Sequence, residues 1–160
     1  MATEKLKFKL ELYATVWDKA PHAEILIDDK SYFHNDITGT EDKPDLIEFE
    51  HECAEGKEYI LIIKRSGKVT NQTVVDDNGD IVKDQLLHIK NIEIDEIDIG
   101  SLVYEGVYTP DYPEPWATQQ RQAGVELQES FKNVTRIGHN GIWRFKFESP
   151  FYMWLLENLY

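Results

Sequence analysis

A short segment between residues 104 and 116 combines aromatic and acidic side chains in a pattern that could bind a ligand. Three aromatic residues are spaced by four and two acidic residues lie among them: Tyr108, Tyr112, Trp116, Asp111 and Glu114. Three prolines prevent a helix through the second half of the segment, so we expect an extended conformation. Sugar rings stack their apolar faces on flat aromatic rings, and their hydroxyls bond to carboxylates. We therefore predict Tyr108, Tyr112 and Trp116 as stacking surfaces and Asp111 and Glu114 as polar partners. The alternative is that the aromatic rings only anchor a long loop to the core.

The sequence holds no motif that points to catalysis. It contains no Gly-x-Ser-x-Gly nucleophile turn, no phosphate-binding glycine loop and no dinucleotide fingerprint. The many carboxylates leave a glycosidase pair open, but no particular pair stands out. We predict a protein that is not an enzyme. The alternative from another class is a glycan-active hydrolase, which would need two carboxylates or a Ser/His pair to meet in a cleft.

Metal ligands are also sparse. The five histidines are scattered, and Cys53 is the single cysteine, so we expect no zinc site and no internal disulfide. Asp76, Asn78 and Asp80 alternate as calcium ligands do, but Ile81 stands where a calcium loop needs glycine, and a hairpin turn is favoured. We predict no cofactor. Calcium, bound there or by the looser acidic set between residues 28 and 45, stays open as the alternative.

Charge and composition exclude two classes of partner. Seventeen basic and thirty acidic residues give the 160-residue chain a formal charge of −13. Clustered cations are what phosphate binding requires, so we expect neither nucleic acid nor a membrane surface as partner. The N-terminus lacks the basic and apolar regions of a secretory signal, which predicts synthesis in a cytoplasm without a signal peptide. The length favours one domain, residues 1–160.

Apolar residues recur with a period of two through the first hundred positions. Even positions from Leu6 to Val16 are apolar, and shorter alternating runs follow. We expect strands over residues 5–17, 23–27, 47–53, 59–64, 72–75, 81–83, 87–99 and 142–147, with a bulge near Asp95-Glu96. Asn78-Gly79 predicts a hairpin turn. Many strands separated by turn residues predict an all-β fold, an antiparallel β-sandwich of the jelly-roll or Greek-key type.

Two segments near the C-terminus depart from this pattern. Residues 106–141 read as one long loop insertion within the sandwich. Ser149-Pro150 then opens an aromatic stretch as an N-cap and a first-turn proline would, so we expect a short C-terminal helix or an irregular anchor. Its aromatic residues, Phe151, Tyr152 and Trp154, are the predicted partner interface, through which this chain would contact other proteins or itself.

The opening strand–turn–strand resembles the start of calcium-dependent xylan-binding-type carbohydrate-binding modules. The resemblance rests on residues 10–15, followed by Ala23-Glu24-Ile25-Leu26-Ile27-Asp28-Asp29, and on the pairing of residues 87–89 with residues 92–95. It covers about 100 residues as a pattern of strands. The resemblance implies that the chain folds as a compact jelly roll with a glycan-binding surface. The family's calcium ligands have no matching positions in this chain.

The C-terminal stretch resembles small accessory proteins of large tailed bacteriophages, of the marine myophage type. It runs from Gly141 through Trp143-Arg144-Phe145-Lys146-Phe147 to Leu156. Together the two resemblances imply a non-catalytic interaction or structural protein of a phage virion, a decoration or tail-associated protein. Its partners would be other virion proteins or itself, and a glycan. The alternative within binding proteins is a carbohydrate-binding module of a bacterial system that recognises a polysaccharide.

Overall fold

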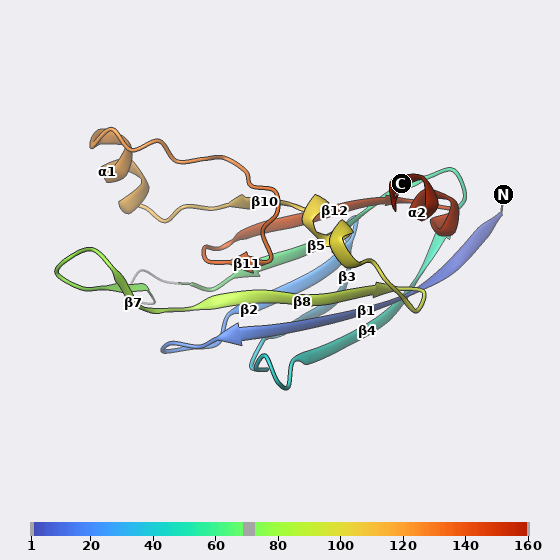
Figure 1. Cartoon of the computed structure of the whole chain (residues 1–160), viewed down its shortest axis with the longest axis horizontal. Helices are drawn as coiled ribbons and strands as arrows, with labels where there is room; N and C mark the ends of the chain where they lie inside the picture. Colours follow the sequence, from blue (N-terminus) through green and yellow to red (C-terminus); the bar gives the residue numbers. More distant parts are fainter. Residues whose placement is uncertain (1, 69–72, 160) are drawn as a thin grey trace.

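Two antiparallel sheets packed face to face make up most of the computed structural model, which describes residues 2–68 and 73–159 (Figure 1). The first sheet has the order β11-β8-β1-β4, with β9 paired to β8, and the second has the order β10-β12-β5-β2-β3. Strands β6 and β7 form a separate hairpin. This arrangement confirms the predicted antiparallel β-sandwich. The strands are β1 (Thr3–Thr15), β2 (His22–Ile27), β3 (Lys30–Asp36), β4 (Asp45–Ala54), β5 (Glu58–Ser66), β6 (Thr73–Val75), β7 (Ile81–Asp84), β8 (Leu86–Ile94), β9 (Ile97–Asp98), β10 (Val107–Pro110), β11 (Arg136–Ile137) and β12 (Gly141–Glu148), and the helices are the 3-10 helix η2 (Gly100–Glu105), α1 (Trp116–Gln122) and α2 (Phe151–Leu159).

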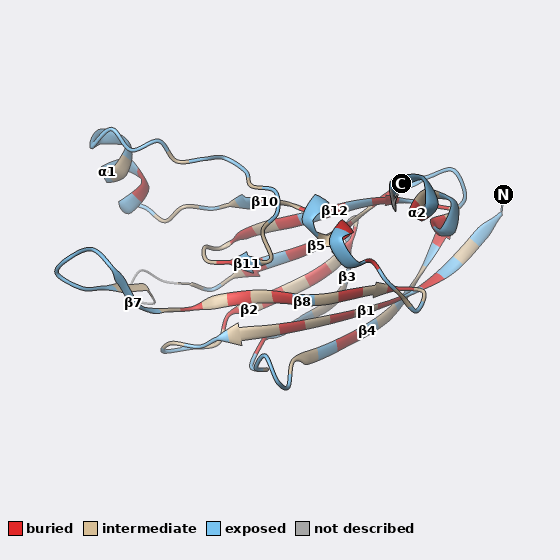
Figure 2. Cartoon of the chain, viewed as in Figure 1, coloured by how far each residue is buried: buried red, intermediate tan, exposed pale blue. Residues whose placement is uncertain are grey.

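The two faces of β1 show why the alternation produces a sandwich. Its even positions from Leu6 to Leu12 are buried, and the lysines at odd positions are more exposed. Buried and less buried positions alternate along β1 in Figure 2. In the register with β4, three outward lysines lie opposite three glutamates: Lys5 opposite Glu52, Lys7 opposite Glu50 and Lys9 opposite Glu48. Cross-strand pairs of opposite charge stabilise a sheet, so the outer face favours the same register as the apolar inner face.

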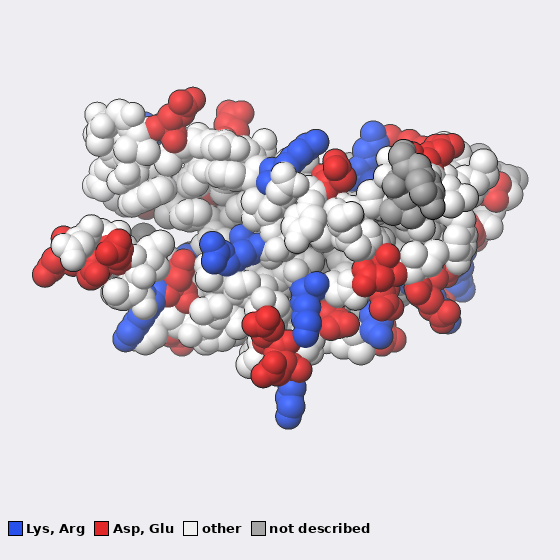
Figure 3. Space-filling view, viewed as in Figure 1, with Lys and Arg blue, Asp and Glu red and all other residues white. Residues whose placement is uncertain are grey.

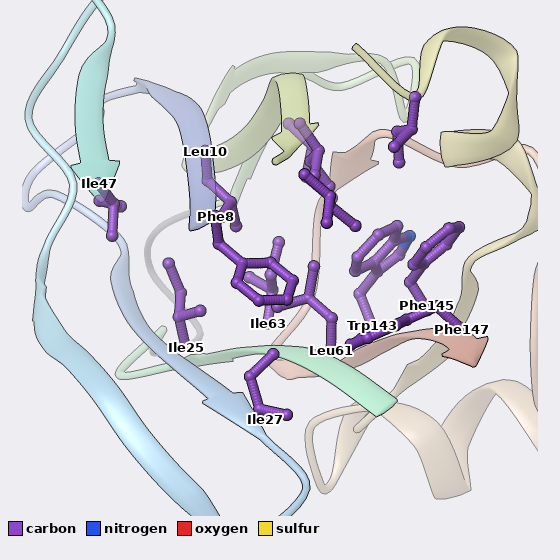
Figure 4. Close-up of a cluster of buried hydrophobic side chains, with 14 of the residues drawn as sticks. Phe8, Leu10, Ile25, Ile27, Ile47, Leu61, Ile63, Trp143, Phe145 and Phe147 are labelled. Atoms are coloured by element: carbon purple, nitrogen blue, oxygen red, sulfur yellow. The ribbon is translucent and has the colours of Figure 1, made fainter. Parts of the chain in front are cut away.

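Side chains from both sheets interlock to form the core. Phe8 and Leu10 of β1 point towards Ile25 of β2, Leu61 of β5 and Trp143 of β12 (Figure 4). A Cβ at Gly106 would lie 2.3 Å from the indole of Trp143, so only glycine lets the chain pass this ring. Trp143 is fully buried, and this close approach seats the start of the 106–141 segment on the core.

Two local expectations were wrong. Asp95 and Glu96 have φ values of 54° and 69° and form the turn between β8 and β9, not a bulge within one long strand. Strand β3 has no counterpart among the expected strands, because its adjacent Tyr32 and Phe33 hide the alternation and the strand has a register shift against β2. Gln72, which we expected to begin a strand, lies outside the described residues.

The 106–141 segment is more ordered than a loop insertion. It contributes β10 to the edge of the second sheet and β11 to the edge of the first, and it contains α1 between them. Figure 1 shows this segment projecting from the same end of the sandwich as the β6–β7 hairpin, while both chain termini lie at the opposite end. Of the two conformations expected at the C-terminus, a short helix and an irregular anchor, the structure has the helix, α2.

Candidate functional site

A groove of about 770 Å³ lies at the end of the sandwich, between the β6–β7 hairpin and the segment that leads into α1 (Figure 3). The hairpin wall presents Val75, Gly79 and Ile81. The opposite wall and the base are formed by Asp111, Tyr112, Pro113, Glu114 and Trp116, and by Lys68, Thr73, Asp84, Gly138, His139 and Asn140. We call this feature the end groove. Its two walls are distant in the sequence, because β8, β9, η2 and β10 lie between the hairpin and the segment that leads into α1.

Four of the five predicted ligand residues line the end groove: Asp111, Tyr112, Glu114 and Trp116. The rings of Tyr112 and Trp116 have centroids 6.0 Å apart and planes inclined by 37°. Trp116 is 37% exposed, and Tyr112 is half-buried with its hydroxyl donating to the carbonyl of Gln128 at 2.6 Å. The structure therefore brings an aromatic surface and two carboxylates together on one wall.

Tyr108, the fifth predicted residue, belongs to the core. Only 4% of it is exposed, and its hydroxyl donates to the carbonyl of His139 at 2.6 Å while accepting from the amide of His139 at 3.1 Å. Burial raises the pKa of Tyr108 to about 12, so the hydroxyl stays protonated and keeps donating. The ring faces the interior because Tyr108 lies opposite the buried Trp143 in the register of β10 with β12. Tyr108 thus holds the His139 segment and does not offer its face to a ligand.

His139 is a groove residue that the sequence reasoning missed. Its ring contacts Tyr112 at 5.2 Å and Trp116 at 5.7 Å between centroids, so it supports both rings from behind. Burial, followed by the nearby Lys68, lowers the pKa of His139. No sequence signal marks this residue, because its contacts depend on β11 and β12 bringing their connecting turn next to the α1 segment.

An ion pair forms the base of the end groove. The Lys68 ammonium lies 2.7 Å from Asp84, and this carboxylate also accepts from the hydroxyl of Thr73 at 2.7 Å. Burial raises the pKa of Asp84, but hydrogen bonds from Lys68 and Thr73 outweigh it, and the net pKa is lowered. Asn140 both accepts from the Lys68 amide, at 2.9 Å, and donates to the Lys68 carbonyl, at 3.0 Å. The base is therefore a fixed polar surface.

The predicted partner interface is divided between core and surface. Phe151 is fully buried, and the half-buried Trp154 packs edge-on against Phe145 with centroids 5.9 Å apart. Phe151 is therefore not free for a partner, because α2 folds it back onto β12, while Trp154 keeps part of its surface exposed. Tyr152 is 49% exposed, and its hydroxyl donates to Asp95 at 2.9 Å. The exposed apolar side chains of the helix are instead Met153 and Leu156.

Metal ligands do not cluster in the part of the chain that the structure describes: no three His, Cys, Asp or Glu side chains there are placed to hold one ion. In the Asp76–Asp80 turn, Asp76 accepts from the amides of Asn78 and Asp80, both at 2.9 Å. This is the hydrogen bonding of an acidic turn residue with its own backbone. Within residues 2–68 and 73–159, no helix has the length and apolarity to span a membrane.

Comparison with known proteins gives one structural match. The fold is similar to that of vCBM60. This is a calcium-dependent carbohydrate-binding module solved in its selenomethionine form, in work on circular permutation between two families of such modules. The match is 6% identical, covers 88% of this chain and 89% of the other, and has a TM-score of 0.49. Such modules are also the class that the sequence resemblance names. No family model and no curated protein matches the sequence.

Proposed function

We propose that this protein binds glycans without transforming them, and that the end groove is the binding site. The observation that supports this most is the wall on which Tyr112 and Trp116 lie beside Asp111 and Glu114. Ligand sites typically combine apolar and aromatic lining with a few placed polar groups. This wall has that composition.

The groove offers each part of a sugar a suitable partner. A pyranose ring has an apolar C–H face that stacks on the exposed ring of Trp116. Its hydroxyls both donate and accept, and the groove supplies carboxylates at Asp111 and Glu114 and an amide side chain at Asn140. The opposite wall adds the apolar side chains of Val75 and Ile81, which are largely exposed on the hairpin. A chain of sugar units can thus lie between the two walls.

The carboxylates of the groove favour binding over hydrolysis. A glycosidase needs one carboxyl with a raised pKa to act as general acid. The most buried groove carboxylate, Asp84, has a lowered pKa because Lys68 and Thr73 hydrogen-bond to it. It is held as an anion, and so it is unsuited to donate a proton. This argues against Asp84 as the general acid of a hydrolase.

A glycan array, run with and without Ca²⁺, tests the proposal. Isothermal titration of the best ligand then compares the wild type with Trp116→Ala, and Tyr104→Ala is the control because Tyr104 is an exposed aromatic residue outside the groove. We expect Trp116→Ala to weaken binding about tenfold or more and Tyr104→Ala to leave it unchanged. A flat array in both conditions, or equal losses in the two variants, contradicts the proposal. Release of reducing ends by the purified chain contradicts its non-catalytic part.

The role in a phage virion, as a decoration or tail-associated protein made without a signal peptide, stays a prediction from the sequence resemblance. If it holds, a glycan-binding groove would serve attachment to a surface polysaccharide. Capsid or tail genes on either side of the coding sequence would support this role, and a polysaccharide-utilisation neighbourhood would favour the bacterial alternative.

A further inference from the structure

The charge of the end groove is strongly one-sided. Its lining contains three carboxylates, Asp84, Asp111 and Glu114, against the single ammonium of Lys68. That ammonium is already neutralised by Asp84 at 2.7 Å. Asp111 and Glu114 are exposed, and among the described residues neither forms an ion pair. The aromatic wall therefore carries two uncompensated negative charges.

The surroundings strengthen this field. The hairpin turn next to Gly79 adds three exposed acidic residues, Asp76, Asp77 and Asp80, and acidic atoms gather on that lobe in Figure 3. Two cations lie nearby without lining the groove: Lys83, over the ring of Trp17 at 3.8 Å, and Arg121 of α1, whose charge acts on Tyr112. The acidic residues of the groove and of its hairpin turn outnumber them. Charges within a Debye length of about 10 Å act together on a ligand in the groove.

Aromatic faces and carboxylates both attract cations. An ammonium is attracted to the face of tryptophan or tyrosine and to a carboxylate beside it. A uronate or sulfate in the same position would be repelled by Asp111 and Glu114. A neutral sugar would gain the stacking contact and hydrogen bonds from its hydroxyls, but no charge pairing.

Resting on the proposed function, we propose that the end groove selects glycans that carry protonated amino groups, such as deacetylated amino-sugar chains, over neutral and acidic glycans. Trp116 and Tyr112 stack on the sugar ring, while Asp111 and Glu114 pair with its ammonium group. Selectivity then resides in the two carboxylates, and basal affinity resides in the rings.

Titration of four ligands tests this at about pH 5.5, where the amino groups of the sugar are protonated. The ligands are a glucosamine hexamer, its fully N-acetylated form, an oligogalacturonate and oligolysine. We expect the glucosamine hexamer to bind about tenfold tighter than the acetylated one at about 0.01 M salt, with a smaller ratio at about 0.15 M. Equal or tighter binding of the neutral or acidic glycan overturns the charge selectivity and leaves the proposed function standing. Binding of oligolysine alone, or of none of the four, also overturns the charge selectivity, whereas the proposed function is overturned by a flat glycan array.

A pair of charge-matched variants places the effect in the groove. Asp111→Asn/Glu114→Gln keeps hydrogen-bonding groups for sugar hydroxyls but removes both charges, so it should weaken binding of the glucosamine hexamer about three- to tenfold more than binding of the acetylated hexamer. Asp29→Asn/Glu55→Gln removes the same two charges from exposed positions outside the groove and should change neither ligand. Equal losses in both double variants would show that overall charge acts, and not the groove wall, and would overturn the proposal.

Discussion

The two aromatic segments of this chain, residues 104–116 and 149–160, are alike in composition and differ in what the fold does with them. Phe151 and Trp154 in the second segment pack on Phe145 and Phe147 of β12, which belongs to the core. Tyr112 and Trp116 in the first segment pack mainly on each other and on His139, at the rim of a groove. An aromatic ring becomes core or contact surface according to whether a sheet face is available to cover it.

The difference has a cause in how each segment is attached. Helix α2 begins where Glu4 accepts a hydrogen bond from the amide of Phe151 at 2.8 Å and another from the hydroxyl of Ser149. This joins both ends of the chain and directs Phe151 inward. The α1 segment is attached through β10, beyond which Asp111 bonds through its amide to Asn140 and the chain leaves the sheet. The rings after that point have no sheet to cover them.

Truncating a ring in the tail should give the largest effect. Phe151→Ala removes a fully buried ring, and we expect it to lower the free energy of unfolding by about 3–5 kcal/mol, measured by urea denaturation. Met153→Ala on the same helix is the control. Met153 is 61% exposed, and its truncation should change the free energy by less than about 0.5 kcal/mol. Similar losses in the two variants would mean that α2 is not docked as the structure shows, and the contrast between the segments would fail.

Glu4→Gln examines the attachment of α2 itself. A neutral amide accepts weaker hydrogen bonds than a carboxylate and interacts less with a helix N-terminus, so we expect a loss of about 1–2 kcal/mol in unfolding free energy. Glu55→Gln, at an exposed position, should have no measurable effect. Glycan affinity should stay unchanged in both, because the groove lies at the other end of the sandwich. A loss of affinity in Glu4→Gln would show that the two ends are coupled.

Lowering the pH should reduce the free energy of unfolding through protonation of His139. Of the three predicted changes in stability, this one should be the smallest. The pKa of His139 is lowered from its ordinary value of 6.5, so the unfolded chain takes up the proton first as the pH falls. The contribution of His139 to the free energy of unfolding is therefore complete above pH 6.5 and is lost as the pH falls below it. His139→Phe keeps a ring against Tyr112 and Trp116 and removes the titration, so its urea midpoint should fall less between pH 7.5 and 5.

The decline should not vanish in His139→Phe. Burial also lowers the pKa values of His51 and His88, and these residues contribute in the same direction. A pH dependence identical to that of the wild type would show that His139 does not titrate against Lys68 and the groove rings as the geometry implies.

The interior of the sandwich could be predicted from the sequence in detail. Leu6, Phe8, Leu10 and Leu12 alternate with charged residues, and period-two alternation is a local property that any strand with one buried face must satisfy. Four of the five predicted ligand residues line the groove, because prolines exclude a helix and leave the rings without a helical face to bury. The prediction that Tyr108 contacts a ligand was wrong because Pro110, two residues later, suggested that the chain had already left the sheet at Tyr108. Nothing in the local sequence shows that β10 continues as far as Pro110.

Local patterning in the sequence thus determined the two sheets, the inward and outward faces of their strands, the acidic exterior and the C-terminal helix. Tertiary structure alone decided which aromatic rings remain accessible, that His139 supports two of them, and that the β6–β7 hairpin forms the opposite wall of the groove. The reason is physical: alternation is fixed between neighbours along the chain, whereas accessibility depends on which distant residues arrive to cover a side chain. Lys68 follows β5, Asp84 ends β7 and Tyr112 follows β10, and the three meet at one groove only because these strands end on the same side of the sandwich.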